Sequence, residues 1–531
     1  MKMKKWITLM IGMIMITSLL GGCSSKAPEA ETAEKKETST NLTESGMPIV
    51  KEPITVKFFA PKRFASQKLN DIMIWNEYKK MTNINVEWND VSREQLAEKK
   101  NIILASGEYP DVFYGSRFSS SDLQKYGQQG VFIKLNDLID NYAPNIKRIL
   151  DQNPDIKKAM TMPDGNIYAL PTITDPSFTA MRSGTFLWFQ KQWLDKLGMS
   201  EPKTTEEFYN FLKQVKEKDP NAIPIGGSSI DNLIGLIKGS WGLGNRGLSH
   251  PNVDVDPKSG DLRYIPAALE YKEMLQYLNK LYSEGLLEKD TFSANADQFI
   301  ANGMQGKYAA HAGYNPEATL KQKGYIGGLT LKGPHEDQLY ANVGATVGSS
   351  GQFVITQNNK NPEATMRWVD YLYSDEGAKM FFMGFENVTY TKTADGQYEF
   401  VDEIKNNPKG LTQDQAAAQY LTWPGGGYPG ILKQQFFKGA EGMPASVEAV
   451  KKVESQFPEE VWTPFVYTQE ETDKMSALKS DIETYVTEMQ AKFITGNVPL
   501  TEWDNYIATL QKMGLDEYME IYKAAYERYK K

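Results

Sequence analysis

The sequence predicts an α/β protein, in which short apolar strands alternate with amphipathic helices. Residues 54–59 alternate between apolar and polar side chains as a strand does, and a helical pattern follows over residues 70–81. The pattern continues as a strand, a helix and a strand at residues 85–88, 93–104 and 111–114. Because helices that link successive strands favour parallel pairing, we expect a parallel sheet with crossover helices.

The same alternation returns later, and the last quarter of the chain is helical. Residues 185–189 are strand-like, and Thr204 with Glu207 has the spacing of a helix-opening capping box. Thr468 and Glu471 repeat that spacing before a long apolar periodicity. Gly496 is expected to end the helix that this box opens, and Gly514 is expected to end the helix after it. A final helix is expected over residues 515–529.

Composition and charge exclude several classes of protein. The chain has 531 residues, of which 40% are hydrophobic and 11% aromatic, which is enough for a large core and excludes wholesale disorder. Its net charge is −8, so no excess of lysine and arginine is present to bind a phosphate backbone. Nucleic acid is therefore not an expected partner.

Cysteine and histidine are scarce. Cys23 is the single cysteine, which leaves no internal disulfide and no cysteine-rich metal site. The three histidines, His250, His311 and His335, form no zinc-binding motif. Neither of the glycine-rich nucleotide-binding motifs occurs. We expect no cofactor and no metal.

The first residues have the pattern of a secretory signal. Three lysines within the first five residues precede an uncharged run over residues 6–20. This run is shorter than the ~20 apolar residues of a membrane-spanning helix. The following Leu20-Gly21-Gly22-Cys23 resembles the bacterial lipobox, which predicts a signal peptide over residues 1–22 and a diacylglycerol with palmitate-type chains on Cys23. We expect residues 23–48, which contain no aromatic side chain, to form a flexible tether.

Seven segments, spread over nearly the whole chain, resemble segments that one protein family carries in the same order. They are SGEYPDVFYGS (106–116), GVFIKLNDLIDNYAPNI (130–146), PDGNIYALP (163–171), FLWFQKQWLDKLGMSEPKTTEEF (186–208), YKEMLQYLNKLYSEGLL (271–287), NPEATMRWVDYLYSDEGAKMFF (361–382) and the C-terminal run over 481–529. The chain resembles the extracellular solute-binding proteins of family 1, the carbohydrate-binding lipoproteins of bacterial ABC transporters, and within them the long LplA-like subgroup.

The resemblance implies a periplasmic-binding-protein-like fold of two lobes with a ligand cleft between them. Mapped onto this chain, residues 49–172 and 341–400 build lobe one. Residues 173–340 and 401–531 build lobe two and the C-terminal helices. We expect the lobes to close around a hinge at residues 170–174 and 342–349.

The resemblance also implies the function. It predicts a monomeric, lipid-anchored sugar-transport protein on the extracellular face of the cell membrane, which is not an enzyme. It captures an oligosaccharide and delivers it to two membrane permease subunits, and a cytoplasmic ATPase acts indirectly.

Sugar binding needs aromatic rings that stack on sugar faces and polar groups that bind hydroxyls. Loops expected after strands offer both, and the predicted ligand-binding residues are Arg63, Tyr114, Arg117, Trp241, Tyr314, Trp423 and Tyr428. Trp241 and Tyr314 are the expected stacking platforms of lobe two, opposite Tyr114 and Arg117. A cation at Arg117 favours sugars that carry uronic acids.

Two segments bear on calcium, and other classes of function stay open. Residues 218–224 lie where many relatives carry a calcium loop, but the acidic ladder is missing. Residues 254–261 are rich in aspartate, yet they lack the EF-hand spacing and fit a hairpin turn better. The alternatives are a secreted cell-surface glycoside hydrolase, which needs two carboxylates across a cleft, and a peptide-binding receptor.

Overall fold

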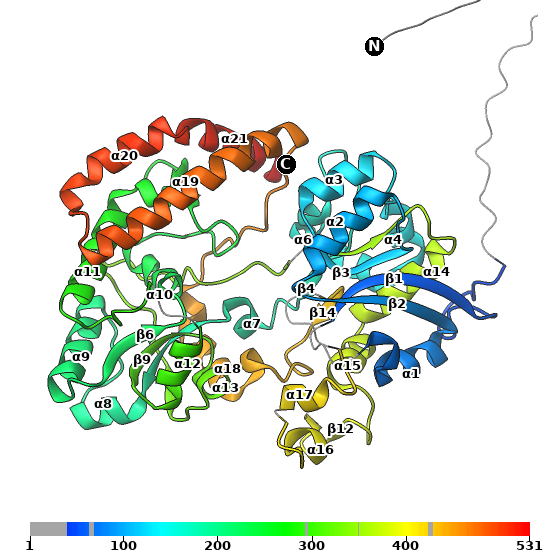
Figure 1. The fold of residues 1–531 in the computed structure, drawn as a ribbon, viewed down its shortest axis with the longest axis horizontal. Coiled ribbons are helices and arrows are strands. Elements are labelled where there is room, and N and C mark those ends of the chain that lie inside the picture. Colours follow the sequence, from blue (N-terminus) through cyan, green and yellow to red (C-terminus); the bar gives the residue numbers. More distant parts are fainter. Residues whose placement is uncertain (1–39, 63–67, 293–295, 349, 412, 423–427) are drawn as a thin grey trace, which may run out of the picture. The chain divides into compact units, whose positions relative to one another are not determined.

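The computed structural model describes residues 40–531, apart from residues 63–67, 293–295, 349, 412 and 423–427. Residues 41–531 form one compact unit. Two four-stranded sheets, each with its own helices, divide this unit into two lobes (Figure 1). The predicted α/β class is therefore confirmed.

Lobe one is built on a largely parallel sheet. Its order is β11 (Gly351–Ile355), β3 (Val112–Phe118), β1 (Ile54–Lys62) and β2 (Ile84–Ser92). β1 is parallel to both β2 and β3, as predicted, and β11 joins β3 antiparallel. The helices of this lobe are α1 (Met73–Thr82), α2 (Leu96–Ser106), α3 (Ser120–Gln128), α4 (Asn136–Tyr142), α5 (Pro144–Gln152), α6 (Pro154–Met160), α14 (Pro362–Asp370) and α15 (Asp375–Met383).

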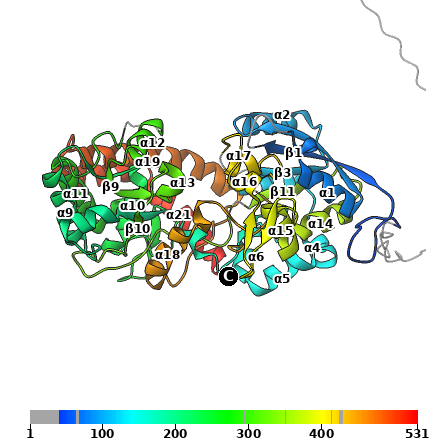
Figure 2. The same ribbon diagram turned by 90° about the horizontal axis from the view of Figure 1, so that it is seen from below.

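Lobe two is built on a mixed sheet. Its order is β10 (Tyr325–Gly327), β5 (Phe186–Gln190), β9 (Tyr308–Gly313) and β6 (Ile223–Gly227). β6 is parallel to β9, whereas β5 and β10 are antiparallel to their neighbours. Around the sheet lie α8 (Lys191–Leu197), α9 (Thr205–Lys218), α10 (Ile230–Ile237), α11 (Leu269–Ser283), α12 (Ala296–Met304), α13 (Pro316–Leu320) and α18 (Pro444–Val453) (Figures 1 and 2).

The C-terminal helices start and stop where the sequence predicts. They are α19 (Gln469–Thr495), α20 (Trp503–Lys512) and α21 (Leu515–Tyr529). Thr468 and Glu471 form a complete capping box, and Gly496 ends α19 with a left-handed φ of 77°. At α9 the box is only half present, because the Glu207 carboxylate accepts from the Lys203 N–H instead of from Thr204.

Three segments of the chain cross between the lobes and lie next to one another: β4 (Thr172–Thr174), β14 (Gly430–Leu432) and the segment around Thr346. β4 pairs in parallel with β14, and Thr174 N–H donates to the Thr346 carbonyl at 2.7 Å. Two of these passages lie in the predicted hinge segments, of which Ser349 is outside the described residues. A short helix, α7 (Thr179–Ser183), follows β4.

The stretch before β14 packs on lobe one. It contains β12 (Tyr390–Lys392), β13 (Tyr398–Phe400), α16 (Asp402–Lys405) and α17 (Gln413–Ala417). The Ile74 N–H of α1 donates to the Tyr420 carbonyl, and Tyr428 stacks on Phe381 of α15. We therefore place the final return to lobe two after Leu432 instead of at residue 400.

The segment just before lobe one is also folded. Thr43 N–H donates to the Ile49 carbonyl at 3.0 Å, and Arg367 of α14 donates to the Thr43 carbonyl. Ile49 is only 1% exposed. The predicted flexible tether was therefore too long at its C-terminal end, because residues 41–48 pair with the folded unit. Its earlier part lies outside the described residues.

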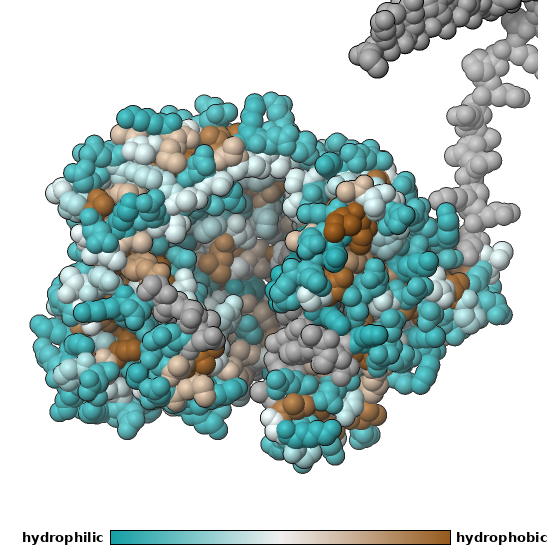
Figure 3. Space-filling model, in the orientation of Figure 1, coloured by the Kyte–Doolittle hydropathy of each residue, from teal (hydrophilic) through white to brown (hydrophobic). Residues whose placement is uncertain are grey.

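The surface drawn in Figure 3 is mostly hydrophilic. Large hydrophobic side chains that reach solvent are scattered among the described residues, for example Leu269 at 67% and Met304 at 55% exposure. No helix within residues 40–531, as far as they are described, has the length and hydropathy to span a membrane.

Candidate ligand-binding site

Two of the predicted aromatic residues lie in the core of lobe one. Tyr114 is 3% exposed, stacks on Phe58 and meets Trp88 edge to face at 5.3 Å. Tyr428 is 0% exposed and stacks on Phe381 at 3.9 Å, with its hydroxyl donating to the Leu372 carbonyl. Neither ring presents a face to a ligand, so both belong to core packing and not to sugar stacking.

Trp241 is likewise a core residue. It closes a 3₁₀ turn, η2 (Lys238–Trp241), is 3% exposed and packs against Tyr277 of α11 at 5.4 Å. Gly242 follows with a left-handed φ of 66° and turns the chain back. The expected stacking platform is thus replaced by a contact between η2 and α11.

Tyr314 differs from these three, since its side chain is 47% exposed. It follows β9 directly, and its ring lies beside Gly184, which ends α7 near the lobe-connecting passages. Burial of part of the side chain and the negative charge of Glu441 raise the pKa of its hydroxyl. The structure therefore leaves Tyr314 as an accessible aromatic candidate.

Three predicted residues, Arg63, Trp423 and Cys23, lie outside the described residues. They stay predictions.

Arg117 lines a cavity at one edge of the lobe-one sheet. The cavity has a volume of about 250 Å³, and its lining includes Lys62, Arg93, Lys100, Gly115 and Arg117. Since β1, β2 and β3 are parallel, their carboxyl ends meet at this edge, where ligands of open α/β sheets bind. Lys62 ends β1, Arg93 follows β2, and Arg117 lies near the end of β3.

The backbone at the end of β3 is unusual. Gly115 has a φ of 64° and Arg117 a φ of 51°, which is rare for a residue with a side chain. β11 pairs with β3 across an irregular register at this point. Such a conformation persists only where the surrounding structure over-determines it, and it is common at ligand sites.

The cavity is electropositive. Burial and the positive charge of Arg93 lower the pKa of Arg117, and burial lowers the pKa of Lys100. Lys100 Nζ donates to the Ser116 carbonyl at 3.1 Å and lies 4.5 Å from the centre of the Phe118 ring. None of the described lining residues is acidic. An anionic ligand group suits this environment.

Sequence patterns indicated Arg117 as a site residue but not its neighbours in the cavity. Lys62 stood beside the predicted Arg63, whereas Arg93 and Lys100 lie far from both along the chain. A cation at the end of each predicted parallel strand was the available signal. Its meaning depends on strand order, which the pattern of residues alone does not give.

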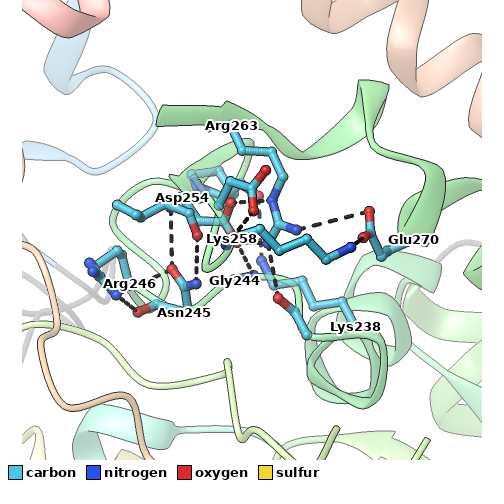
Figure 4. A network of polar contacts seen from close by, with 12 residues as sticks. Lys238, Gly244, Asn245, Arg246, Asp254, Lys258, Arg263 and Glu270 are labelled. Atoms are coloured by element: carbon cyan, nitrogen blue, oxygen red, sulfur yellow. Dashed lines mark hydrogen bonds and ion pairs between the residues drawn. The ribbon is translucent and has the colours of Figure 1, made fainter. Parts of the chain in front are cut away.

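The aspartate-rich segment forms the predicted hairpin. β7 (Val253–Val255) pairs antiparallel with β8 (Leu262–Tyr264) around a turn. Asp254 is fully buried and accepts hydrogen bonds from the Gly244 N–H at 2.7 Å and from Arg263 Nε at 2.8 Å (Figure 4). The carboxylate that looked calcium-like therefore binds an arginine of its own hairpin.

The loop over residues 218–224 holds itself together with local hydrogen bonds. Lys216 Nζ donates to the Pro220 carbonyl, and the Asn221 N–H donates to Asp219. Within the described part of the chain, no three His, Cys, Asp or Glu side chains gather as a metal site would require.

Two sheet-based lobes, joined by adjacent chain passages and holding a charged cavity at the strand ends, define a two-lobed solute-binding protein. The chain belongs to the bacterial extracellular solute-binding protein family, which matches residues 68–379. This membership supports a solute-binding role.

Individual relatives span nearly the whole chain. The fructooligosaccharide ABC transporter substrate-binding protein FusA of Streptococcus pneumoniae is 29% identical and covers 96% of each chain. Its structure with kestose matches with a TM-score of 0.72 and 25% identity, over 90% of this chain and 99% of FusA. Lipoprotein LipO of Bacillus subtilis is 23% identical over 99% of this chain and 98% of LipO. The polygalacturonan/rhamnogalacturonan-binding protein YtcQ of Bacillus subtilis is 24% identical over 74% of this chain and 75% of YtcQ.

Proposed function

We propose that this protein is the solute receptor of an ABC importer and captures an oligosaccharide. The observation that carries this proposal is the likeness to FusA, which covers 96% of both chains and extends to a FusA structure that holds kestose. YtcQ, whose name gives it an acidic polysaccharide, supports the same class of ligand.

Two described residues are the candidates for ligand contact. Arg117 lines the cavity of lobe one, and Tyr314 exposes its ring at the end of β9 in lobe two. An exposed ring can stack on the apolar face of a sugar, while a guanidinium binds hydroxyl or anionic groups. Arg63 and Trp423 remain proposed contacts on the sequence argument alone.

Ligand binding closes the lobes in this proposal. β4, β14 and residues 346–348 run side by side and are the natural place for a hinge, because few backbone torsions there can reorient a whole lobe. Ligand shifts the population only if it binds the closed form better. X-ray scattering with saturating ligand should give a smaller radius of gyration, and an unchanged radius would reject closure.

Cys23 anchors the protein in this proposal. The lipobox-like sequence predicts cleavage after Gly22 and lipid on Cys23, and LipO is a lipoprotein. The receptor, a monomer without a cofactor, then works at the extracellular face of the membrane. It serves two permease subunits, which a cytoplasmic ATPase drives. Cys23→Ser should release it into the medium, and full retention on the membrane would reject the anchor.

The proposal is tested by mixing the purified protein with kestose, nystose and oligogalacturonides. A receptor leaves the sugar intact and gains stability, about 2.7 kcal/mol at a ligand concentration of 100 Kd. Heat-unfolded protein is the control for nonspecific effects. Release of shorter sugars would instead identify a glycoside hydrolase, and stabilisation by peptides alone would identify a peptide receptor.

A further inference from the structure

The lobe-one cavity gathers positive charge from elements that are distant in sequence. Lys62, Arg93 and Arg117 come from the carboxyl ends of three neighbouring parallel strands, and Lys100 comes from α2. The register of β1 with β2 pairs Lys62 with Ser92, the residue before Arg93. The sheet itself therefore brings these cations together.

The acidic groups near these cations are engaged in local contacts. The exposed Glu94 has a lowered pKa, because its own backbone N–H, Ser92 and the charge of Arg93 stabilise the carboxylate. Asp122 accepts a hydrogen bond from Ser119 at the start of α3 and attracts Lys100 from there. Neither carboxylate belongs to the described lining of the cavity.

The cations differ in how the protein holds them. Lys100 is fixed by the Ser116 carbonyl and the Phe118 ring, so it contributes a fixed positive charge to the wall. Arg93 is exposed and Arg117 partly exposed. An arginine has a planar fork of donors that matches carboxylate and phosphate oxygens, and it keeps its charge at any physiological pH.

The cavity suits one charged sugar unit. Its volume of about 250 Å³ is slightly below the roughly 300–1,000 Å³ of pockets that enclose a drug-sized molecule. Gly115, which has no side chain, lets a ligand approach the backbone at the end of β3. Burial and, second to it, the charge of Arg93 lower the pKa of Arg117, and an anion placed here offsets the repulsion between the two arginines.

We infer that the oligosaccharide of this receptor carries an anionic group, a sugar carboxylate or a sugar phosphate, which binds between Arg93 and Arg117. This inference rests on the proposed function and narrows its ligand class. Neutral oligosaccharides lack the group that the cavity is charged to receive.

The test measures affinity by calorimetry for matched ligand pairs. The pairs are trigalacturonate with its methyl ester, glucuronate-substituted xylotriose with xylotriose, and a disaccharide 6-phosphate with the same disaccharide. In at least one pair the acidic member should bind about tenfold more tightly or better, and added salt should weaken only that member. The pair that responds identifies carboxylate or phosphate.

Substitutions test which residues cause the preference for the acidic ligand. Arg93→Gln and Arg117→Gln should each weaken the acidic ligand about tenfold and weaken its neutral partner by a clearly smaller factor. Lys213→Gln, at an exposed position of α9, is the matched control and should change neither. Arg93 lies outside the strands and is exposed, so this variant remains informative if Arg117→Gln lowers the melting temperature.

The binding results that would overturn this inference differ from those that would overturn the proposed function. Equal binding of both members, or equal weakening of both by Arg93→Gln, overturns the anionic ligand and leaves the sugar receptor standing. Binding of kestose with no acidic ligand bound has the same meaning. Absence of binding to every oligosaccharide overturns the proposed function, and this inference with it.

Discussion

The Asp254 hairpin and the lobe-one cavity both hold arginines, which the protein treats in opposite ways. At the hairpin, Arg263 meets the buried Asp254 with two of its nitrogens, at 2.8 Å and 2.7 Å. At the cavity, Arg93 and Arg117 stand together in a lining that includes no described carboxylate. The hairpin supplies its own counter-charge, while the anion that we propose for the cavity comes from the ligand.

The difference separates structural from ligand-binding charge. A buried pair is strongly coupled to folding, because removing one partner leaves the other charged and desolvated. Exposed cations at strand ends contribute little to folding, since water and salt screen them. Substitutions should therefore affect stability at the hairpin and affinity at the cavity.

The largest expected effect is at the hairpin. Asp254→Ala leaves the Gly244 N–H without its acceptor and Arg263 without its buried carboxylate, and should lower the free energy of unfolding by about 3–5 kcal/mol. Arg93→Gln should change it by less than about 0.5 kcal/mol. Urea unfolding measures both. The comparison fails if Asp254→Ala is tolerated, or if Arg93→Gln is as destabilising as Asp254→Ala.

Acid should weaken the buried regions while the cavity keeps its charge. Burial lowers the pKa of His250 and of His311 to about 4, from about 6.5. His250 faces the Tyr522 hydroxyl and the Thr463 carbonyl, with Lys479 as the nearby repelling cation. His311 packs beside rings that include Tyr308, and its Nε2 lies 3.2 Å from the Tyr314 carbonyl.

The direction in which stability changes with pH follows from proton binding. The unfolded chain takes up protons near pH 6.5 and the folded protein only near pH 4, so stability is complete above pH 6.5 and falls between 6.5 and 4. Each histidine accounts for about 3 kcal/mol. Melting curves across this range check the loss. His250→Gln should flatten it, whereas His335→Gln, at an exposed histidine, should not. A pH-independent melting temperature would contradict the burial argument.

Tyr314 extends the comparison to lobe two, because it is exposed where Trp241 is buried. If Tyr314 is a sugar platform, Tyr314→Ala should weaken binding roughly 30-fold, about 2 kcal/mol, and change stability by less than about 1 kcal/mol. Tyr314→Phe, the matched control, keeps the ring and should keep most of the affinity. Calorimetry decides, and unchanged affinity in Tyr314→Ala removes this residue from the site.

Local patterns predicted the elements well. The capping box at Thr468 and Glu471 and the strand over residues 54–59 depend on neighbouring residues only, and both are present. β3 shows the limit of such patterns. It extends to Phe118, beyond the predicted end at residue 114, so Tyr114 lies inside the strand with its ring in the core and not at the start of a ligand-binding loop.

The candidate site depends on contacts that no local pattern contains. Tyr428 is buried by Phe381, which lies 47 residues earlier, in α15. Arg93 reaches Arg117 only because the strand order is β3, β1, β2. Residue types gave candidates, but sheet topology and burial decided which of them can meet a ligand.

The last prediction concerns Arg117 and tests whether its backbone conformation serves the ligand. Its φ of 51° lies in the left-handed region, which glycine adopts without the clash of a side chain. Arg117→Gly should therefore leave the free energy of unfolding unchanged or raise it by up to about 1 kcal/mol, while it weakens an anionic ligand about tenfold. Lys321→Gly is the matched control, because Lys321 follows α13 with a φ of 56° and is not among the residues that line the cavity. It should give a similar gain in stability with unchanged affinity. Urea unfolding and calorimetry on the two variants separate the outcomes. A large loss of stability in Arg117→Gly alone would mean that the guanidinium holds the end of β3 in place, and that Arg117 belongs with the structural charges of the hairpin.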